Sequence, residues 1–132
     1  MKKNLSKKCV QRVGRCSTLS KQSNHPNHHL GAVIVKGGRI LASGYNRIQQ
    51  HNKLSFRKFN SSVHAEQDAI RRLLDQPALL FGSSLYVSRI GRSGSLLLAK
   101  PCAFCMDLIR AVGIKKIFYT DSDGSITMEK VS

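Results

Sequence analysis

Two short stretches of the chain carry residue types that bind and use a transition metal. The first holds His64 and Glu66, separated by one residue, and the second reads Pro101-Cys102-Ala103-Phe104-Cys105. One imidazole and two thiolates can hold a tetrahedral zinc ion and leave its fourth position open. Glu66 is not needed as a ligand, so its carboxylate is free to carry protons. The spacing therefore predicts a catalytic Zn²⁺ site.

The expected reaction follows from these side chains. Zinc held by His64, Cys102 and Cys105 would polarise a water molecule toward hydroxide near neutral pH. Glu66 would take a proton from that water and pass it to a ring nitrogen and then to a leaving amine. Attack on the carbon that bears the amino group would release ammonia. We therefore expect hydrolytic deamination of an aromatic amine.

A single Cys-x-x-Cys pair also occurs in redox proteins and as half of a structural zinc site. A structural site needs a fourth protein ligand, for which the candidates are Cys9, Cys16 and a histidine of residues 25–29. None of these candidates has a spacing that favours the arrangement. A redox pair would leave His64 and Glu66 without a role, so the catalytic interpretation is preferred.

Three histidines lie close together in His25-Pro26-Asn27-His28-His29, which its proline and asparagine predict to be a loop. These histidines could bind a second metal ion, line the mouth of a substrate pocket, or form polar surface. The sequence leaves all three possibilities open.

The motifs lie among segments with the patterns of alternating helices and strands. Helices are predicted over residues 3–19, 64–74 and 102–112. Strands are predicted over residues 30–35, 40–45, 85–88, 114–120 and 125–131. We expect Ser61 or Ser62 to cap the second helix, and Pro101 to favour the start of the third. All three metal ligands would then come from the N-termini of two helices.

Two segments have no clear period. Residues 46–60 are expected to be a basic loop with aromatic residues, and residues 89–99 are expected to be an insertion before the cysteine motif. Both are candidates for contacts with the substrate.

The charge of the chain is strongly positive. Its 132 residues include 22 lysines and arginines against 7 aspartates and glutamates, which gives a formal net charge of +15. The first acidic residue is Glu66. Such a field attracts phosphate, whether on a free nucleotide or along a nucleic acid. A solvated surface without a specific ligand is the alternative.

Length and composition place the chain among globular proteins. The length predicts a single domain over residues 1–132. No apolar stretch is long enough to span a membrane, and no apolar run follows the basic N-terminus, so we expect a cytoplasmic protein without a membrane partner. In that compartment, four cysteines are expected to be thiols or metal ligands rather than disulfides.

The motifs and their order resemble the cytidine/deoxycytidylate deaminase superfamily of zinc-dependent nucleobase deaminases. The likeness covers about residues 30–120 and is carried by residues 30–35, 43–46, 64–66, 101–105 and 113–117. It implies a three-layer α/β fold in which a five-stranded mixed sheet has helices packed on it and the zinc helices share one face. The turn Asp121-Ser122-Asp123-Gly124 predicts that the last two strands form an antiparallel hairpin.

The resemblance also implies roles for residues around the zinc ligands and the catalytic Glu66. Asn46 would hydrogen-bond the sugar or the base of the substrate. The backbone of Ala65 would help to hold the base. The resemblance further implies a homo-oligomer.

The substrate is expected in one of two classes. The first is a small-molecule cytosine nucleoside or nucleotide, with deoxycytidylate favoured by the positive charge. The second is cytosine or adenine within single-stranded DNA or RNA, including tRNA, with the basic N-terminal half along the backbone and Phe56 and Phe59 as stacking residues. Another amine-bearing ring, such as guanine, and a non-catalytic zinc-binding module are further alternatives.

Different parts of the chain resemble different members of the superfamily. The histidine ligand and Gly44-Tyr45-Asn46 resemble deoxycytidylate and transfer-RNA adenosine deaminases. The hairpin expected at the C-terminus is similar to that of cytidine deaminases.

Overall fold

The computed structural model describes residues 6–50 and 60–131. Its helices are α1 (Lys7–Ser20), α2 (Ala65–Arg71), α3 (Pro77–Leu80) and α4 (Ala103–Ala111). Its strands are β1 (His29–Lys36), β2 (Arg39–Tyr45), β3 (Arg47–Gln50), β4 (Asn60–Val63), β5 (Ser84–Ile90), β6 (Leu96–Leu97), β7 (Lys116–Thr120) and β8 (Ile126–Lys130). No helix of the described residues is long and apolar enough to cross a membrane.

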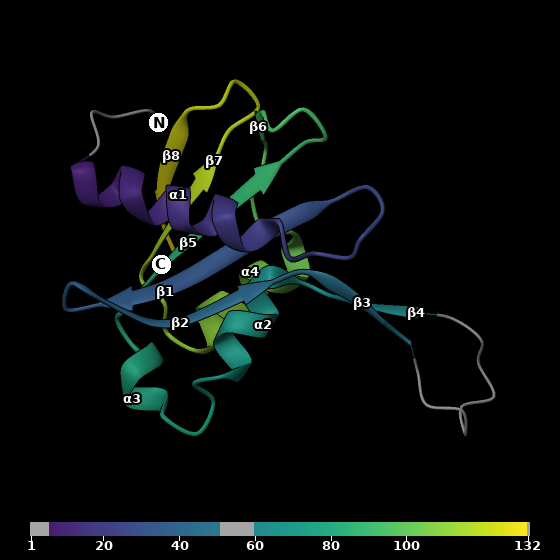
Figure 1. Ribbon diagram of the computed structural model, residues 1–132. Coiled ribbons are helices and arrows are strands. Elements are labelled where there is room, and N and C mark those ends of the chain that lie inside the picture. The colour runs from purple at the N-terminus through teal and green to yellow at the C-terminus, as the bar shows by residue number, and fades with distance from the viewer. Residues whose placement is uncertain (1–5, 51–59, 132) are drawn as a thin grey trace.

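The main sheet is mixed and has the order β2-β1-β5-β7-β8, with the two-residue β6 paired to β5 (Figure 1). Only the β5–β7 pair of this path is parallel. Strands β7 and β8 form an antiparallel hairpin, from the Lys116–Lys130 pair to the Thr120–Ile126 pair. The expected five-stranded mixed sheet with a C-terminal hairpin is therefore confirmed, and β6 is an addition to it.

The helices cover the sheet from both sides (Figure 1). Alternate residues of a strand point to opposite faces, and on β1 Ala32 and Ile34 pack in the core cluster that includes residues of α2 and α4. On the same strand, Val33 and Val35 pack in a second cluster with the Cys9, Val13 and Cys16 side chains of α1. The three-layer arrangement with α2 and α4 on one face is confirmed.

Two glycines allow these layers to approach closely. A Cβ atom on Gly31 would lie 2.0 Å from the carbonyl oxygen of Cys16 in α1. A Cβ atom on Gly44 would lie 2.6 Å from the backbone nitrogen of Ala69 in α2. Both separations are too short for a real Cβ, so these two positions bring α1 and α2 against opposite faces of the sheet.

Several element boundaries differ from the prediction. The first helix begins at Lys7 with Ser6 as its N-cap, where the Ser6 hydroxyl accepts the Cys9 backbone N–H at 3.2 Å. The prediction that Ser61 or Ser62 caps the second helix is wrong, because both belong to β4 and the N-cap is His64. That helix also ends at Arg71 rather than residue 74, and the short α3 follows it.

The two segments without a clear period contain strands. Strand β3 pairs with β4 as a separate antiparallel ribbon, with Arg47 opposite Val63. Strand β6 pairs with Arg89 and Ile90 at the end of β5. These pairings join distant parts of the chain, which is why a local pattern did not predict them. Residues 51–59, with the proposed stacking residues Phe56 and Phe59, lie outside the described residues.

Candidate metal centre

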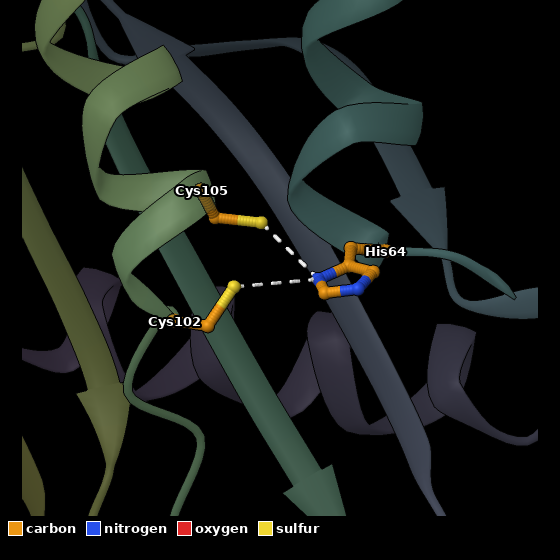
Figure 2. A group of neighbouring side chains, drawn as sticks. All are labelled: His64, Cys102 and Cys105. Atoms are coloured by element: carbon orange, nitrogen blue, oxygen red, sulfur yellow. Dashed lines mark hydrogen bonds between the residues drawn. The ribbon is translucent and has the colours of Figure 1, made fainter.

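The three side chains expected to bind zinc lie together between the N-termini of α2 and α4 (Figure 2). The Nδ1 atom of His64 is 3.2 Å from Sγ of Cys105 and 3.8 Å from Sγ of Cys102. The three ligand atoms all lie within 4.8 Å of one another. The structure thus gathers one nitrogen and two sulfurs around a common point.

This donor set fits a zinc ion. With a Zn–N distance of about 2.1 Å and a Zn–S distance of about 2.3 Å, a tetrahedral ion holds its nitrogen and sulfur ligands about 3.6 Å apart. The observed separations of 3.2 and 3.8 Å lie on either side of that value. Within the described ranges, this is the one group of three or more histidine, cysteine or acidic side chains with ligand atoms this close.

The three candidate metal ligands lie at the N-terminal ends of α2 and α4. His64 has the extended backbone of an N-cap residue, and its N–H donates to Oε1 of Gln67 at 2.9 Å, which holds the first turn of α2. Cys102 is the N-cap of α4, where its carbonyl accepts the Met106 N–H at 2.8 Å. Cys105 is the third residue of α4, so both sulfurs lie on the turn that faces His64.

Glu66 lies beside this group and is 3% exposed. Burial raises the pKa of Glu66 to about 7. Burial also raises the pKa of the Cys105 thiol, and the neighbouring charge of Glu66 adds to that rise. A divalent cation held between the ligands would lower both pKa values again. Glu66 is therefore a dry carboxyl group next to the ligand set that can exist with or without its proton.

A pocket of about 200 Å³ opens at the metal centre. Its wall comprises His25, His28, Leu30, Asn46, His64, Ala65, Glu66, Lys100 and Cys102. Two of the three ligand residues and the candidate proton carrier thus line one cavity. A flat ring placed there would meet water activated at the metal and a proton carrier at the same time.

The two residues expected to hold the substrate also line this pocket. Asn46 is buried, and its side chain accepts the Leu30 N–H at 2.8 Å and donates to the His28 carbonyl at 2.8 Å. A carboxamide retains one further N–H and one further lone pair beyond these two bonds. Ala65 is the first residue of α2, where a backbone N–H has no partner within the helix.

Two of the loop histidines, His25 and His28, line the pocket. Nδ1 of His25 accepts the backbone N–H groups of Asn27 and His28 at 3.0 and 3.1 Å, so it serves to shape the loop. Burial and the nearby charge of Arg89 lower the pKa of His28. None of the loop histidines joins a potential metal group in the described parts of the chain.

The cysteines outside the motif do not complete a structural zinc site. Cys9 and Cys16 are buried with α1 on the opposite face of the sheet from the metal centre. All four cysteines are free of disulfides. Among the residues that the structure describes, the candidate centre therefore has three side chains that could hold a metal ion.

A comparison with known protein families decides the class of this centre. The sequence profile of the cytidine and deoxycytidylate deaminase zinc-binding region matches residues 7–121. The chain belongs to this family. It accordingly carries the zinc-binding region of the cytidine and deoxycytidylate deaminases.

Family members with known names differ in substrate. The riboflavin biosynthesis protein RibD of Actinobacillus pleuropneumoniae is 32% identical over 118 residues, which are 83% of this chain and 25% of that protein. The dCMP deaminase of cyanophage S-TIM5 is 24% identical with a TM-score of 0.68 and covers 89% of this chain and 86% of its own. A likeness at that identity shows the fold.

A third relative joins two activities in its name. It is the diaminohydroxyphosphoribosylaminopyrimidine deaminase/5-amino-6-(5-phosphoribosylamino)uracil reductase of Thermotoga maritima, which is 27% identical with a TM-score of 0.60. The match covers 87% of this chain and 30% of that one. The chain thus spans about a quarter of the length of the RibD protein and less than a third of the length of the Thermotoga maritima protein.

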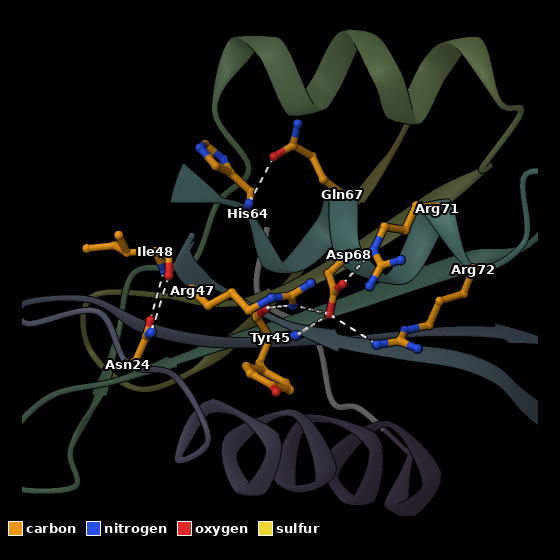
Figure 3. Close-up of polar contacts among 9 residues, drawn as sticks. All are labelled: Asn24, Tyr45, Arg47, Ile48, His64, Gln67, Asp68, Arg71 and Arg72. Atoms are coloured by element: carbon orange, nitrogen blue, oxygen red, sulfur yellow. Dashed lines mark hydrogen bonds and ion pairs between the residues drawn. The ribbon is translucent and has the colours of Figure 1, made fainter. Parts of the chain in front are cut away.

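A buried carboxylate on α2, that of Asp68, lies among three arginines and the Tyr45 backbone (Figure 3). The side chain of Asp68 is 0% exposed and binds the Arg47 guanidinium at 2.9 Å and Nε of Arg71 at 2.8 Å. It also accepts the Tyr45 backbone N–H at 3.3 Å. Asp68 therefore fixes the residues on both sides of Asn46, so it positions Asn46 without touching the pocket.

Replacing Asp68 by asparagine is expected to destabilise the fold by about 2–3 kcal/mol. Removing one partner of a buried ion pair ordinarily costs about 3–5 kcal/mol. The loss expected here is at or below the low end of that range, because the arginines left without a partner can turn toward water. The urea midpoint at neutral pH measures the loss. As a control, Asp107→Asn removes an exposed carboxylate that pairs with Arg110 at 3.3 Å, and it should change stability by less than about 0.5 kcal/mol.

The same variant has a pH signature. Burial alone would raise the pKa of Asp68, but hydrogen bonds from Arg47, Arg71 and the Tyr45 backbone outweigh it and leave the pKa below its ordinary value. The carboxylate thus stabilises the fold above about pH 4, and this contribution is lost as the pH falls through the lower folded pKa. The stability gap between wild type and Asp68→Asn should narrow on acidification. A gap that stays constant down to about pH 2 would contradict this role.

Some residues of the site had a weak signal in the sequence or none. The spacing of Asp68, Arg71 and Arg72 by three and four residues is typical of helical ion pairs and could have indicated the network. Gln67, three residues after His64, has capping-box spacing. Leu30 and Lys100 line the pocket, but no local sequence pattern indicates this position for either residue.

Proposed function

We propose that the chain is a zinc-dependent hydrolytic deaminase of a cytosine nucleoside or nucleotide, with a phosphate-bearing monomer such as deoxycytidylate as its preferred substrate. The observation that carries the proposal is the buried Glu66 in one pocket with His64 and Cys102, while Cys105 lies within 3.2 Å of His64. A redox pair or a structural metal site has no use for that carboxyl group.

The residues of the pocket divide the work of the reaction. His64, Cys102 and Cys105 would hold zinc, which when bound supplies the Lewis acidity that makes water a nucleophile near neutral pH. Glu66 accepts the proton that the attacking water loses and delivers it to the ring nitrogen, and a second transfer releases the amino group as ammonia. Ala65 N–H and the remaining hydrogen-bonding capacity of Asn46 orient the base or the sugar.

Charge supports a phosphate-bearing substrate. Lys100 lines the pocket together with Cys102, and its half-exposed ion pair with Glu129 at 3.4 Å leaves ammonium hydrogens for a phosphate. His25 and His28 line the same pocket and are further potential donors. The formal net charge of +15 favours the approach of any anionic substrate.

A second ring class has specific support. The likeness to the Thermotoga maritima deaminase/reductase, at 27% identity over 87% of the chain, favours a phosphoribosylated aminopyrimidine in place of cytosine. Both candidates are monomers that carry a phosphate and lose an exocyclic amine. Deamination within a single-stranded nucleic acid is supported only by the charge of the chain.

Ammonia release separates these substrates. The zinc-loaded chain is incubated with cytidine, deoxycytidine, their monophosphates, guanine, adenosine, the phosphoribosylated aminopyrimidine and a cytosine-containing oligonucleotide. We expect turnover of deoxycytidylate with a kcat/KM at least tenfold above that of deoxycytidine, because only the nucleotide offers Lys100 a phosphate. Turnover of the oligonucleotide without the monomers would overturn the proposal. Turnover of the aminopyrimidine alone would replace the cytosine ring by the second class.

The other expectations from the sequence concern the whole protein. The homo-oligomeric state and the cytoplasmic location stay predictions. Light scattering of the purified chain measures the first of them.

A further inference from the structure

Helix α1 carries a concentration of positive charge and contains no acidic residue. Lys7, Lys8 and Arg15 are exposed, Arg12 is half-buried, and the first acidic residue of the chain is Glu66. The ion pairs of the described residues all lie outside α1. Lys7, Lys8 and Arg15 therefore face solvent, and none of them forms an ion pair within the described part of the chain.

The positions of these cations are unfavourable for the helix itself. Lys7 and Lys8 occupy the first turn, which has no acidic residue, although the N-terminal end of a helix disfavours positive charge. Lys8 and Arg12 are four residues apart, and Arg12 and Arg15 are three apart, so they repel one another along one face. A helix that only covered the sheet would gain from acidic residues at these positions. The arrangement is suited to an anionic ligand.

The same face holds a groove. It has a volume of about 320 Å³ and lies between α1 and the β1–β2 turn, with Lys8, Gln11, Arg12, Arg15, Gly38 and Ile40 as its walls. The Arg12 guanidinium is held in place because NH1 donates to the Tyr86 hydroxyl at 3.0 Å and the group lies 5.4 Å from the centre of that ring. One fixed guanidinium and two exposed cations thus border a single depression.

This groove faces away from the catalytic pocket. The inner side of α1 packs with Val33, Val35 and Tyr86, whereas the helices of the metal centre pack on the other face of the sheet (Figure 1). A ligand in the groove is therefore separated from His64 and Glu66 by the thickness of the sheet. It cannot place a base in the pocket through the groove itself.

We infer that the outer face of α1 and the β1–β2 turn form a docking surface for the phosphate backbone of a single-stranded nucleic acid, separate from the deaminase site. Lys8 and Arg15 are seven residues apart, about 10 Å along the helix, so a polymer can meet several cations with consecutive phosphates. A membrane surface fits less well, because Cys9, Val13 and Cys16 are buried on the sheet and Val10 alone is the large apolar side chain that the described part of α1 exposes, which is too little for an apolar face in lipid. This inference does not depend on which substrate the pocket takes.

The test compares two triple variants of the full chain that each remove three positive charges. The first is Lys7→Gln/Lys8→Gln/Arg15→Gln on α1, and the control is Arg110→Gln/Lys115→Gln/Lys130→Gln, at exposed positions outside α1. Binding of a fluorescein-labelled single-stranded oligonucleotide of about 20 nucleotides is followed by anisotropy over a range of salt concentrations. Circular dichroism verifies that both variants are folded.

The α1 variant should weaken binding at least tenfold at about 0.1 M salt and reduce the slope of log K against log salt by about 2, since each lost phosphate contact removes about 0.7 for a single strand. The control should keep the wild-type slope, and both should deaminate monomers at the wild-type rate. Equal losses in both variants would show an effect of total charge and overturn the inference. So would wild-type binding by the α1 variant, or α1-dependent binding to phosphatidylserine vesicles without binding to the oligonucleotide.

Discussion

Glu66→Gln is expected to reduce kcat about 10⁴-fold while the chain keeps its zinc. Glutamine has nearly the same shape as glutamate, so the packing around a side chain that is 3% exposed should persist. It cannot accept a proton from water, and positioned proton transfer contributes about 10²–10⁴ to a rate. The upper end applies because Glu66 has to move protons at both the attack and the departure of the amine.

Zinc content and turnover must be measured on the same preparation of this variant. Metal per chain should equal that of wild type, and the KM of the active substrate should change less than kcat, because the ligands and the pocket wall are intact. Asp107→Asn is a matched control with wild-type turnover expected, since it makes the same acid-to-amide change at an exposed position of α4 that does not line the pocket. A Glu66→Gln variant with wild-type turnover would refute the proton-carrying role, whereas one without zinc would show that Glu66 serves the metal centre instead.

Cys102→Ala is expected to lose zinc and, with it, all turnover. Structural sites with four ligands bind zinc with about 10–16 kcal/mol, so one ligand contributes about 3–4 kcal/mol, or two to three orders of magnitude in affinity. The side chain of Cys102 is exposed, so its removal leaves no buried cavity. A folded chain without metal is therefore the expected product, and metal analysis after dialysis against a weak chelator measures it.

A second thiol variant separates the metal centre from the general effect of losing a cysteine. Cys9→Ala removes a buried thiol on the α1 side of the sheet, far from the ligands. It should keep zinc and activity and change stability modestly, because cysteine and alanine are both small. If Cys102→Ala kept its zinc and its activity, the three-ligand centre would be incorrect.

The parts of the fold that were predictable are those with local signals. The Gly37-Gly38 pair predicts the β1–β2 hairpin. The φ angle is 59° at Gly37 and 77° at Gly38, and other residues rarely adopt such values. Pro101 before Cys102 and Gly113 after α4 mark the two ends of that helix. The two cysteine ligands could be predicted from the sequence, because the N-cap residue and the third residue of a helix lie on the same turn.

The parts that were not predictable depend on contacts between distant segments. Strands β3 and β4 pair from Arg47 opposite Val63 to Gln50 opposite Asn60. Residues 46–60 contain no periodic pattern that would predict this pairing. The three-sided environment of Asp68 requires β2, β3 and α2 to be in place. Lys100 precedes the cysteine motif in the chain, but only the tertiary structure makes it part of the pocket wall.

The metal ligands come from two helices on either side of strand β5 in the sequence, and Cys102 lies 38 positions after His64. Neither helix can present its ligands to the other until β5 has joined β1 and β7 within the sheet. Zinc affinity is therefore a property of the assembled core rather than of a local loop. Fraying at the edges of the molecule should leave the ion bound, whereas opening of the central strands should release it. Loss of zinc would then report global unfolding, and bound zinc would slow that unfolding through the same linkage.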